Sequence, residues 1–176
     1  MEESLRLYRQ LITEVEAAMA PLLERHRNIL RCAPGCAACC QALSLLPIEA
    51  YLVYRAFLAL PAARQEQLRL AGDRASTTCP LLADQRCTIY EARPLICRTH
   101  GLAIAYVDPE HETIEVSACP LNFSEDFSFG HDDLLFLDPF NARLATLNQQ
   151  AARALGLAAA TRLAMAEILA LDRFPA

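Results

Sequence analysis

Residues 31–41 read RCAPGCAACCQ and hold half of the chain's cysteines, at Cys32, Cys36, Cys39 and Cys40. Pro34 and Gly35 favour a turn, and the alanines between the thiols allow the backbone to fold tightly. Thiolates spaced three or four residues apart in a turn can converge on one metal ion, because closing so short a loop costs little entropy. This stretch therefore indicates a local centre built on sulfur.

The remaining cysteines are Cys79, Cys87, Cys97 and Cys119, so all eight lie between positions 32 and 119. We expect a single domain of residues 1–176, in which a metal-binding core at 32–119 is flanked by helical segments at 2–30 and 139–172. Side chains of neighbouring residues such as Cys39 and Cys40 diverge in most backbone conformations. The pair therefore indicates two centres that share this loop, one multinuclear cluster, or a spare thiol. For any single cysteine the alternative is a small buried apolar residue.

Composition limits the cellular context. The chain has 176 residues, 54% of them hydrophobic, and a formal net charge of −5, which favours one compact domain and no nucleic-acid partner. Its most apolar region, at 151–171, is interrupted by Arg153, Arg162 and Glu167, which argues against a membrane span. No signal-peptide pattern follows the charged start, so we expect a soluble cytoplasmic protein. Reducing conditions there favour metal or redox chemistry over disulfides.

Apolar periodicity predicts most of the secondary structure. Apolar residues recur every three or four positions from 2 to about 30, which predicts an amphipathic helix that Pro21 kinks or divides. Further helices are expected over 47–59, 61–75, 139–153 and 157–172, and the alternating stretches 102–107 and 113–118 predict a β-hairpin. Residues 122–133 are a candidate mobile loop. The expected fold is mainly α (α+β): a helical domain that encloses an irregular cysteine-rich centre with a small hairpin.

The motifs around the cysteines match a known pattern. CAPGCAACC at 32–40, CPLL at 79–82, CTIYEARPLICR at 87–98 and CP at 119–120 resemble the YkgJ-like cysteine cluster proteins, whose CxxCxxCC signature marks a zinc- or iron-chelating domain. The resemblance covers half of the chain, and the first spacing is one residue longer here. It implies metal binding through Cys32, Cys36, Cys39, Cys40, Cys79, Cys87, Cys97 and Cys119. Some relatives are similar to flagellin lysine methylase, which implies a protein-modifying activity for the wider group.

Thiolate ligands suit both zinc and iron–sulfur clusters. Cys79-Pro80 and Cys119-Pro120 resemble the Cys-Pro pairs after some ferredoxin ligands, and we slightly prefer an iron–sulfur cluster to zinc. Two roles stay open. One is a redox or protein-modifying enzyme whose centre contacts a protein substrate; the other is a structural zinc module that organises a docking surface for a partner without catalysis. Zinc held by four thiolates has no open position, which is typical of a structural site.

Cys32, Cys36 and Cys39 also reproduce the CxxxCxxC spacing of radical S-adenosylmethionine enzymes. We rank this hypothesis lower, because a long helix precedes the motif, parallel βα units are lacking, and five further cysteines would be unexplained. A conventional methyltransferase would need a glycine-rich turn between strand and helix, and the chain has only five glycines.

Charged and aromatic residues adjoin the cysteines. Cations would offset the negative charge of several thiolates, and the candidates are Arg31, Arg86, Arg93 and Arg98. The alternative for each is an ordinary solvated charge. His100 is a candidate ligand or proton carrier, although a lone histidine is more often structural. Tyr90 is expected to pack beneath the cluster.

Overall fold

A computed structural model describes residues 1–72, 77–108 and 110–175. Within these residues the α-helices are α1 (Glu2–Arg25), α2 (Pro47–Leu58), α3 (Ala62–Gly72), α4 (Leu95–Thr99), α5 (Asp138–Ala154) and α6 (Met165–Ala170). Two 3-10 turns, η1 (Tyr90–Ala92) and η2 (His131–Asp133), accompany them. A helix content of 48% and a strand content of 14% confirm the predicted mainly helical α+β class. None of these helices is both long and apolar enough to cross a bilayer.

Short strands pair into small sheets. Strand β1 (Ser44–Leu45) pairs antiparallel with β7 (Leu163–Ala164), and β2 (Leu82–Ala83) pairs antiparallel with β3 (Arg86–Cys87). In the third sheet, β4 (Ala103–Asp108) lies between β5 (Thr113–Ser117) and β6 (Leu134–Phe136), antiparallel to β5 and parallel to β6. The predicted hairpin is the β4–β5 pair. The other pairings were not predicted.

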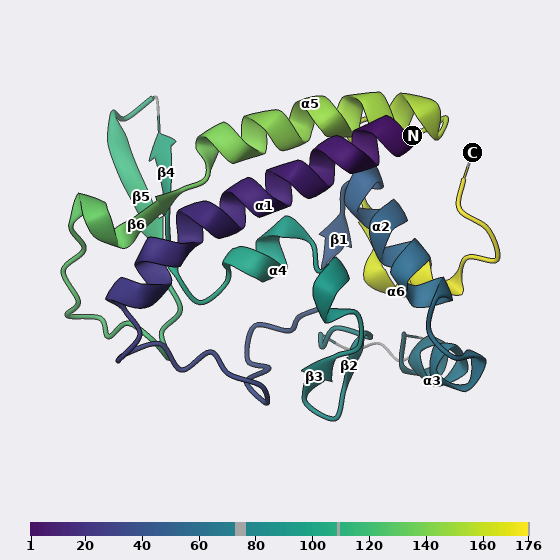
Figure 1. Cartoon of the computed structure of the whole chain (residues 1–176), viewed down its shortest axis with the longest axis horizontal. Helices are drawn as coiled ribbons and strands as arrows, with labels where there is room; N and C mark the ends of the chain where they lie inside the picture. The colour runs from purple at the N-terminus through teal and green to yellow at the C-terminus, as the bar shows by residue number, and fades with distance from the viewer. Residues whose placement is uncertain (73–76, 109, 176) are drawn as a thin grey trace.

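Helix α1 runs along α5 on one side of the molecule, as Figure 1 shows. Its buried side chains recur at three- and four-residue steps, as an amphipathic helix requires: Leu5, Tyr8, Leu11, Ile12, Val15, Met19 and Leu22. They form one hydrophobic cluster with residues of α5, β4 and β6. The helix continues through Pro21 and ends at Arg25, short of the predicted end near 30, because the amides of Ile29 and Leu30 instead close a turn onto the carbonyl of His26.

A second hydrophobic cluster joins α2, α3 and α6. Val53 and Phe57 of α2 are fully buried in it, as is Ile168 of α6. The half-buried residues Cys79, Cys87 and Cys97 pack against this cluster. The cysteine-containing segments therefore pack on the second hydrophobic cluster. Helix α3 lies within the predicted range 61–75, whose last positions fall outside the described residues.

The predicted helix over 157–172 is wrong for most of its length. Gly156 has φ +63°, a left-handed conformation that commonly ends a helix. In the loop that follows, the Ala159 carbonyl accepts a hydrogen bond of 2.8 Å from the Asn148 side chain. Pairing of β7 with β1 then overrides the helix propensity of Leu163 and Ala164. Only Met165–Ala170 is helical.

Residues 122–133, expected as a mobile loop, pack against the end of α1. The rings of Phe123, Phe127 and Phe129 contact one another at centroid distances of 4.8 to 5.2 Å. The rings of Phe123 and Phe127 lie edge-on to His26. Such edge-to-face packing contributes beyond simple burial and holds the segment against the helix.

Candidate metal centre

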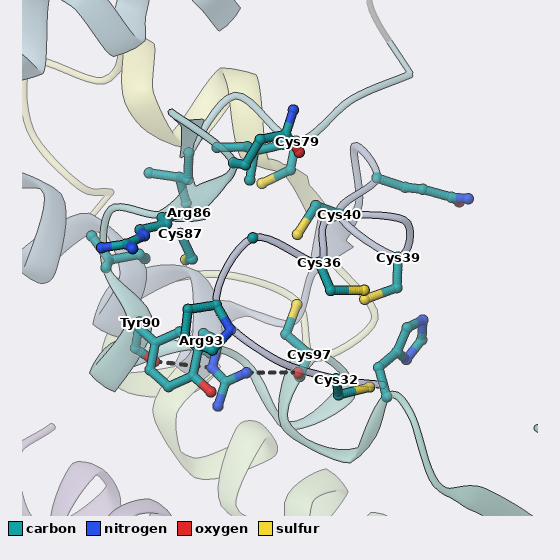
Figure 2. A pocket seen from close by; sticks show the side chains of 18 of the residues that line it. Cys32, Cys36, Cys39, Cys40, Cys79, Arg86, Cys87, Tyr90, Arg93 and Cys97 are labelled. Carbon is teal, nitrogen blue, oxygen red and sulfur yellow. Dashed lines mark hydrogen bonds between the residues drawn. The ribbon is translucent and has the colours of Figure 1, made fainter. Parts of the chain in front are cut away.

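Seven of the eight cysteines line one cavity of about 470 Å³: Cys32, Cys36, Cys39, Cys40, Cys79, Cys87 and Cys97. They come from four separate segments of the chain, and Figure 2 shows how these segments surround the pocket. All eight cysteines are free, so none forms a disulfide in this structure. Seven of the eight predicted ligand residues thus lie at one pocket, while their ligation of a metal stays a prediction.

Two successive turns shape the first segment. The Cys36 amide donates to the Ala33 carbonyl at 2.9 Å, and the Cys40 amide donates to the Ala37 carbonyl at 3.0 Å. Gly35, inside the first of these turns, has φ +101°, which residues with a side chain rarely adopt. The Pro-Gly turn inferred from the sequence thus brings the first four cysteines back toward the pocket.

Backbone pairing attaches the second and third segments to the first. The Cys79 amide donates to the Cys40 carbonyl at 3.0 Å, and the carbonyl of Cys79 accepts from Leu82 at 3.1 Å. Leu82 in β2 faces Cys87 in β3. The two residues between the strands, Asp84 and Gln85, both have positive φ, as a type I′ hairpin turn requires. This hairpin places Cys87 in the lining of the same pocket as Cys40.

The fourth segment carries Cys97 on the short helix α4. Arg93, just before this helix, donates from Nε to the Tyr90 carbonyl at 3.0 Å and from Nη1 to the Cys97 carbonyl at 3.3 Å (Figure 2). Its guanidinium lies 3.6 Å from the centre of the Tyr90 ring, a cation–π contact. Arg93 therefore fixes the backbone of Cys97 and adds a positive charge beside the thiols.

Burial and mutual proximity disfavour ionised thiols here. Burial raises the pKa of Cys97 to about 12 and that of Cys79 to about 11. Burial also raises the pKa of Cys87 and that of Cys40, and the positive charge of Arg93 offsets part of each rise. A bound cation is the further charge that would stabilise several thiolates in this site.

The donor chemistry of the pocket fits a thiophilic metal. Among the described residues that line it, none is an Asp or Glu, so the carboxylates on which Mg²⁺ and Ca²⁺ sites commonly rely are absent. No three His, Cys, Asp or Glu side chains in the described chain already form a metal-holding group. Because zinc–sulfur bonds are only about 2.3 Å long, binding would require the thiols to turn toward a common point.

Cys119 is not among the cysteines that line the pocket. It begins a turn in which its carbonyl accepts hydrogen bonds from the amides of Asn122 and Phe123. The buried Asn122 side chain then donates to the Gly101 carbonyl at 2.7 Å and to Cys32 Sγ at 3.3 Å. Sequence reasoning missed Asn122, whose only local signal is its position after the Cys-Pro pair. Metal ligation by Cys119 stays a prediction.

The arginines near the cysteines divide into two kinds. Arg86 and Arg93 line the pocket, whereas the buried Arg98 donates to the Arg93 carbonyl at 2.9 Å and pairs with Glu16. Arg98 therefore supports the backbone at Arg93 from outside the cavity. Arg31 does not line the cavity either.

Three lining residues other than the cysteines and arginines bear on the sequence predictions: His100, Met165 and Tyr90. His100 lines the cavity, as expected of a candidate ligand. Met165, which the sequence did not indicate, also lines it, and its Sδ lies 3.3 Å from Cys79 Sγ. The expectation for Tyr90 is wrong: the residue is 57% exposed, and its ring lies against Arg93 at the edge of the pocket rather than in the core.

Comparison with known proteins gives one match. The family model CxxCxxCC, described as "Putative zinc- or iron-chelating domain", matches residues 31–120, which is half of the chain. No curated protein and no solved structure matches the sequence. The matched range begins next to Cys32 and ends next to Cys119, so it spans all eight cysteines. The chain belongs to the CxxCxxCC family.

Proposed function

We propose that the protein binds metal through the thiolates of the cysteine pocket, with an iron–sulfur cluster as the first candidate and zinc as the second. One observation carries this proposal: seven cysteines from four segments line a single cavity that lacks carboxylates among its described residues. Free cysteines that served only as small apolar residues would be dispersed through the core. Here none belongs to the fully buried part of either hydrophobic cluster.

The thiols differ in access to solvent, which bears on the role of the metal. Cys32, Cys36 and Cys39 are exposed, so part of the site faces water. A purely structural zinc site is closed by its four ligands and needs no contact with solvent. The exposed side of the pocket leaves room for a redox partner or a protein substrate to approach the bound metal.

The test is purification without chelators under anaerobic conditions, followed by elemental analysis and an absorption spectrum. Iron with matching acid-labile sulfide and broad visible absorption supports the cluster. A colourless protein that contains zinc supports the second candidate. A protein that contains neither metal, and takes up neither on reconstitution, contradicts the proposal.

A matched pair of variants separates ligation from mere cysteine content. Cys97→Ser removes a half-buried thiol inside the pocket, and Cys119→Ser removes a half-buried thiol outside it. We expect the first to lose bound metal. Retention of all metal by Cys97→Ser would contradict the assignment of the pocket, and loss of metal by Cys119→Ser would extend the ligand set to the eighth cysteine.

A further inference from the structure

The seven pocket thiols form two groups that differ in exposure. The inner group is half-buried and consists of Cys40, Cys79, Cys87 and Cys97; the outer group is exposed and consists of Cys32, Cys36 and Cys39. Figure 2 shows the inner sulfurs around one part of the cavity, with those of Cys36 and Cys39 together at its side. The line between the groups falls between two neighbouring residues, Cys39 and Cys40.

Backbone contacts hold the inner group together. Cys40 and Cys79 are joined by the hydrogen bond between the Cys79 amide and the Cys40 carbonyl, and the β2–β3 hairpin fixes Cys87 relative to Cys79. Cys79, Cys87 and Cys97 also pack against the second hydrophobic cluster. The inner group therefore lies on the core side of the pocket.

The outer group has a different set of neighbours. Cys32, Cys36 and Cys39 all lie on the first loop and are exposed at the edge of the cavity, whereas the four inner thiols are half-buried. Cys32 lies at the end of this group, where a Cβ placed on Gly101 would come 2.5 Å from its Sγ. The outer thiols therefore follow the edge of the pocket toward Gly101.

His100 immediately precedes Gly101 and is exposed at the same cavity. Among the lining residues that the structure describes, it is the one imidazole, and no carboxylate is present. Three thiolates and one imidazole are a common tetrahedral ligand set for zinc. An imidazole here would supply the fourth ligand that the three outer cysteines lack.

We propose that the pocket holds two metal centres: an inner one bound by Cys40, Cys79, Cys87 and Cys97, and an outer one bound by Cys32, Cys36, Cys39 and His100. This inference rests on the proposed metal binding. It gives the adjacent cysteines separate roles, because Cys39 belongs to the outer centre and Cys40 to the inner one. A divalent ion leaves a net charge of −2 with four thiolates and −1 with three. Arg93, which donates to the Cys97 carbonyl, places its positive charge beside the more negative, more buried centre.

The experiment is a titration of the reduced, chelator-stripped protein with Zn²⁺ against a chromophoric competitor, under anaerobic conditions. We expect the wild type to bind two zinc ions, Cys97→Ser and Cys36→Ser to bind one each, and the double variant to bind none. His100→Ala should weaken one of the two sites by about tenfold or more and leave the other unchanged. The control His131→Ala replaces an exposed histidine that does not line the pocket, and should bind like the wild type.

The other outcomes overturn specific parts of the proposal. A wild type that binds one ion, or loss of both ions from either single cysteine variant, shows one joint site, while metal binding itself stands. His100→Ala with unchanged affinities removes the histidine from the ligand set. A wild type that binds no zinc and no iron contradicts the proposed function rather than the division. Circular dichroism checks the fold, and Cys40→Ser replaces Cys97→Ser if that variant does not fold.

Discussion

Gly101→Ala tests whether the contact between this loop and Cys32 shapes the pocket. Gly101 has φ +104°, and a methyl group there would lie 2.5 Å from Cys32 Sγ. An alanine in so rarely populated a conformation costs about 1–3 kcal/mol. The exposed Cys32 side chain can rotate away from the new methyl group, but it then loses its hydrogen bond from Asn122, which adds about 1 kcal/mol.

Gly35→Ala is the matched control. Gly35 has nearly the same φ, +101°, but nothing lies within 4 Å of an added Cβ, so only the backbone cost applies. We expect both variants to be less stable than the wild type, with Gly101→Ala the less stable of the two by about 1 kcal/mol, or roughly 2–4 °C in melting temperature for a chain of this size.

Urea denaturation at equal metal loading measures this difference, and the zinc titration described above measures its effect on the outer centre. The reasoning is refuted if Gly101→Ala is as stable as Gly35→Ala and keeps full affinity at both centres. In that case the contact with Cys32 would have no role in shaping the site.

Three further perturbations test other parts of the structure. Burial raises the pKa of Glu49, so the folded protein holds a proton that the unfolded chain releases above about pH 4.5, and the free energy of unfolding falls as pH rises through the interval between the two pKa values. Glu49→Gln, which can still accept the hydrogen bonds from Tyr8 and Leu95, should flatten this dependence in urea denaturation; parallel curves would contradict it. Arg93→Gln should weaken metal binding by roughly 10–100-fold, with Arg93→Lys intermediate because it keeps the charge without the paired donors, and equal affinities of all three proteins would exclude this role. Phe57→Ala should lower the free energy of unfolding by about 3–5 kcal/mol because the ring is fully buried, and a loss below 1 kcal/mol would show that the second hydrophobic cluster rearranges.

The parts of the fold that could be predicted are those with a long periodic signal. Helices α1 and α5 and the β4–β5 hairpin each extend over enough residues for a period of 3.6 or 2 to be visible. Helix α2 was predicted from Pro47 at its start and from a stretch that is apolar nearly all round, which is typical of a buried helix. The pairing of β1 with β7 could not be predicted, because two-residue strands carry no period and their partners are distant in sequence. The same pairing shortened α6, whose residues favour a longer helix.

The candidate site was predictable in its residue types but not in its arrangement. Cysteine spacing identified the thiols that line the pocket, since few other patterns concentrate so many in one region. It did not reveal that Cys119 lies outside the lining or that Tyr90 is exposed. Asn122 and Met165 contact thiols only through tertiary packing, so no local pattern marks them.

Met165 has a consequence for how the protein is made. It lines the pocket, donates its amide to the Leu43 carbonyl and contacts Cys79, so the cavity is incomplete until this residue has been synthesised. At ordinary rates of translation, the thiols of the first loop wait on the order of ten seconds for it. During that interval the nascent chain exposes its reactive thiols without the residues that complete the pocket. A metal ion that arrives before the chain has folded would therefore meet only a partial site.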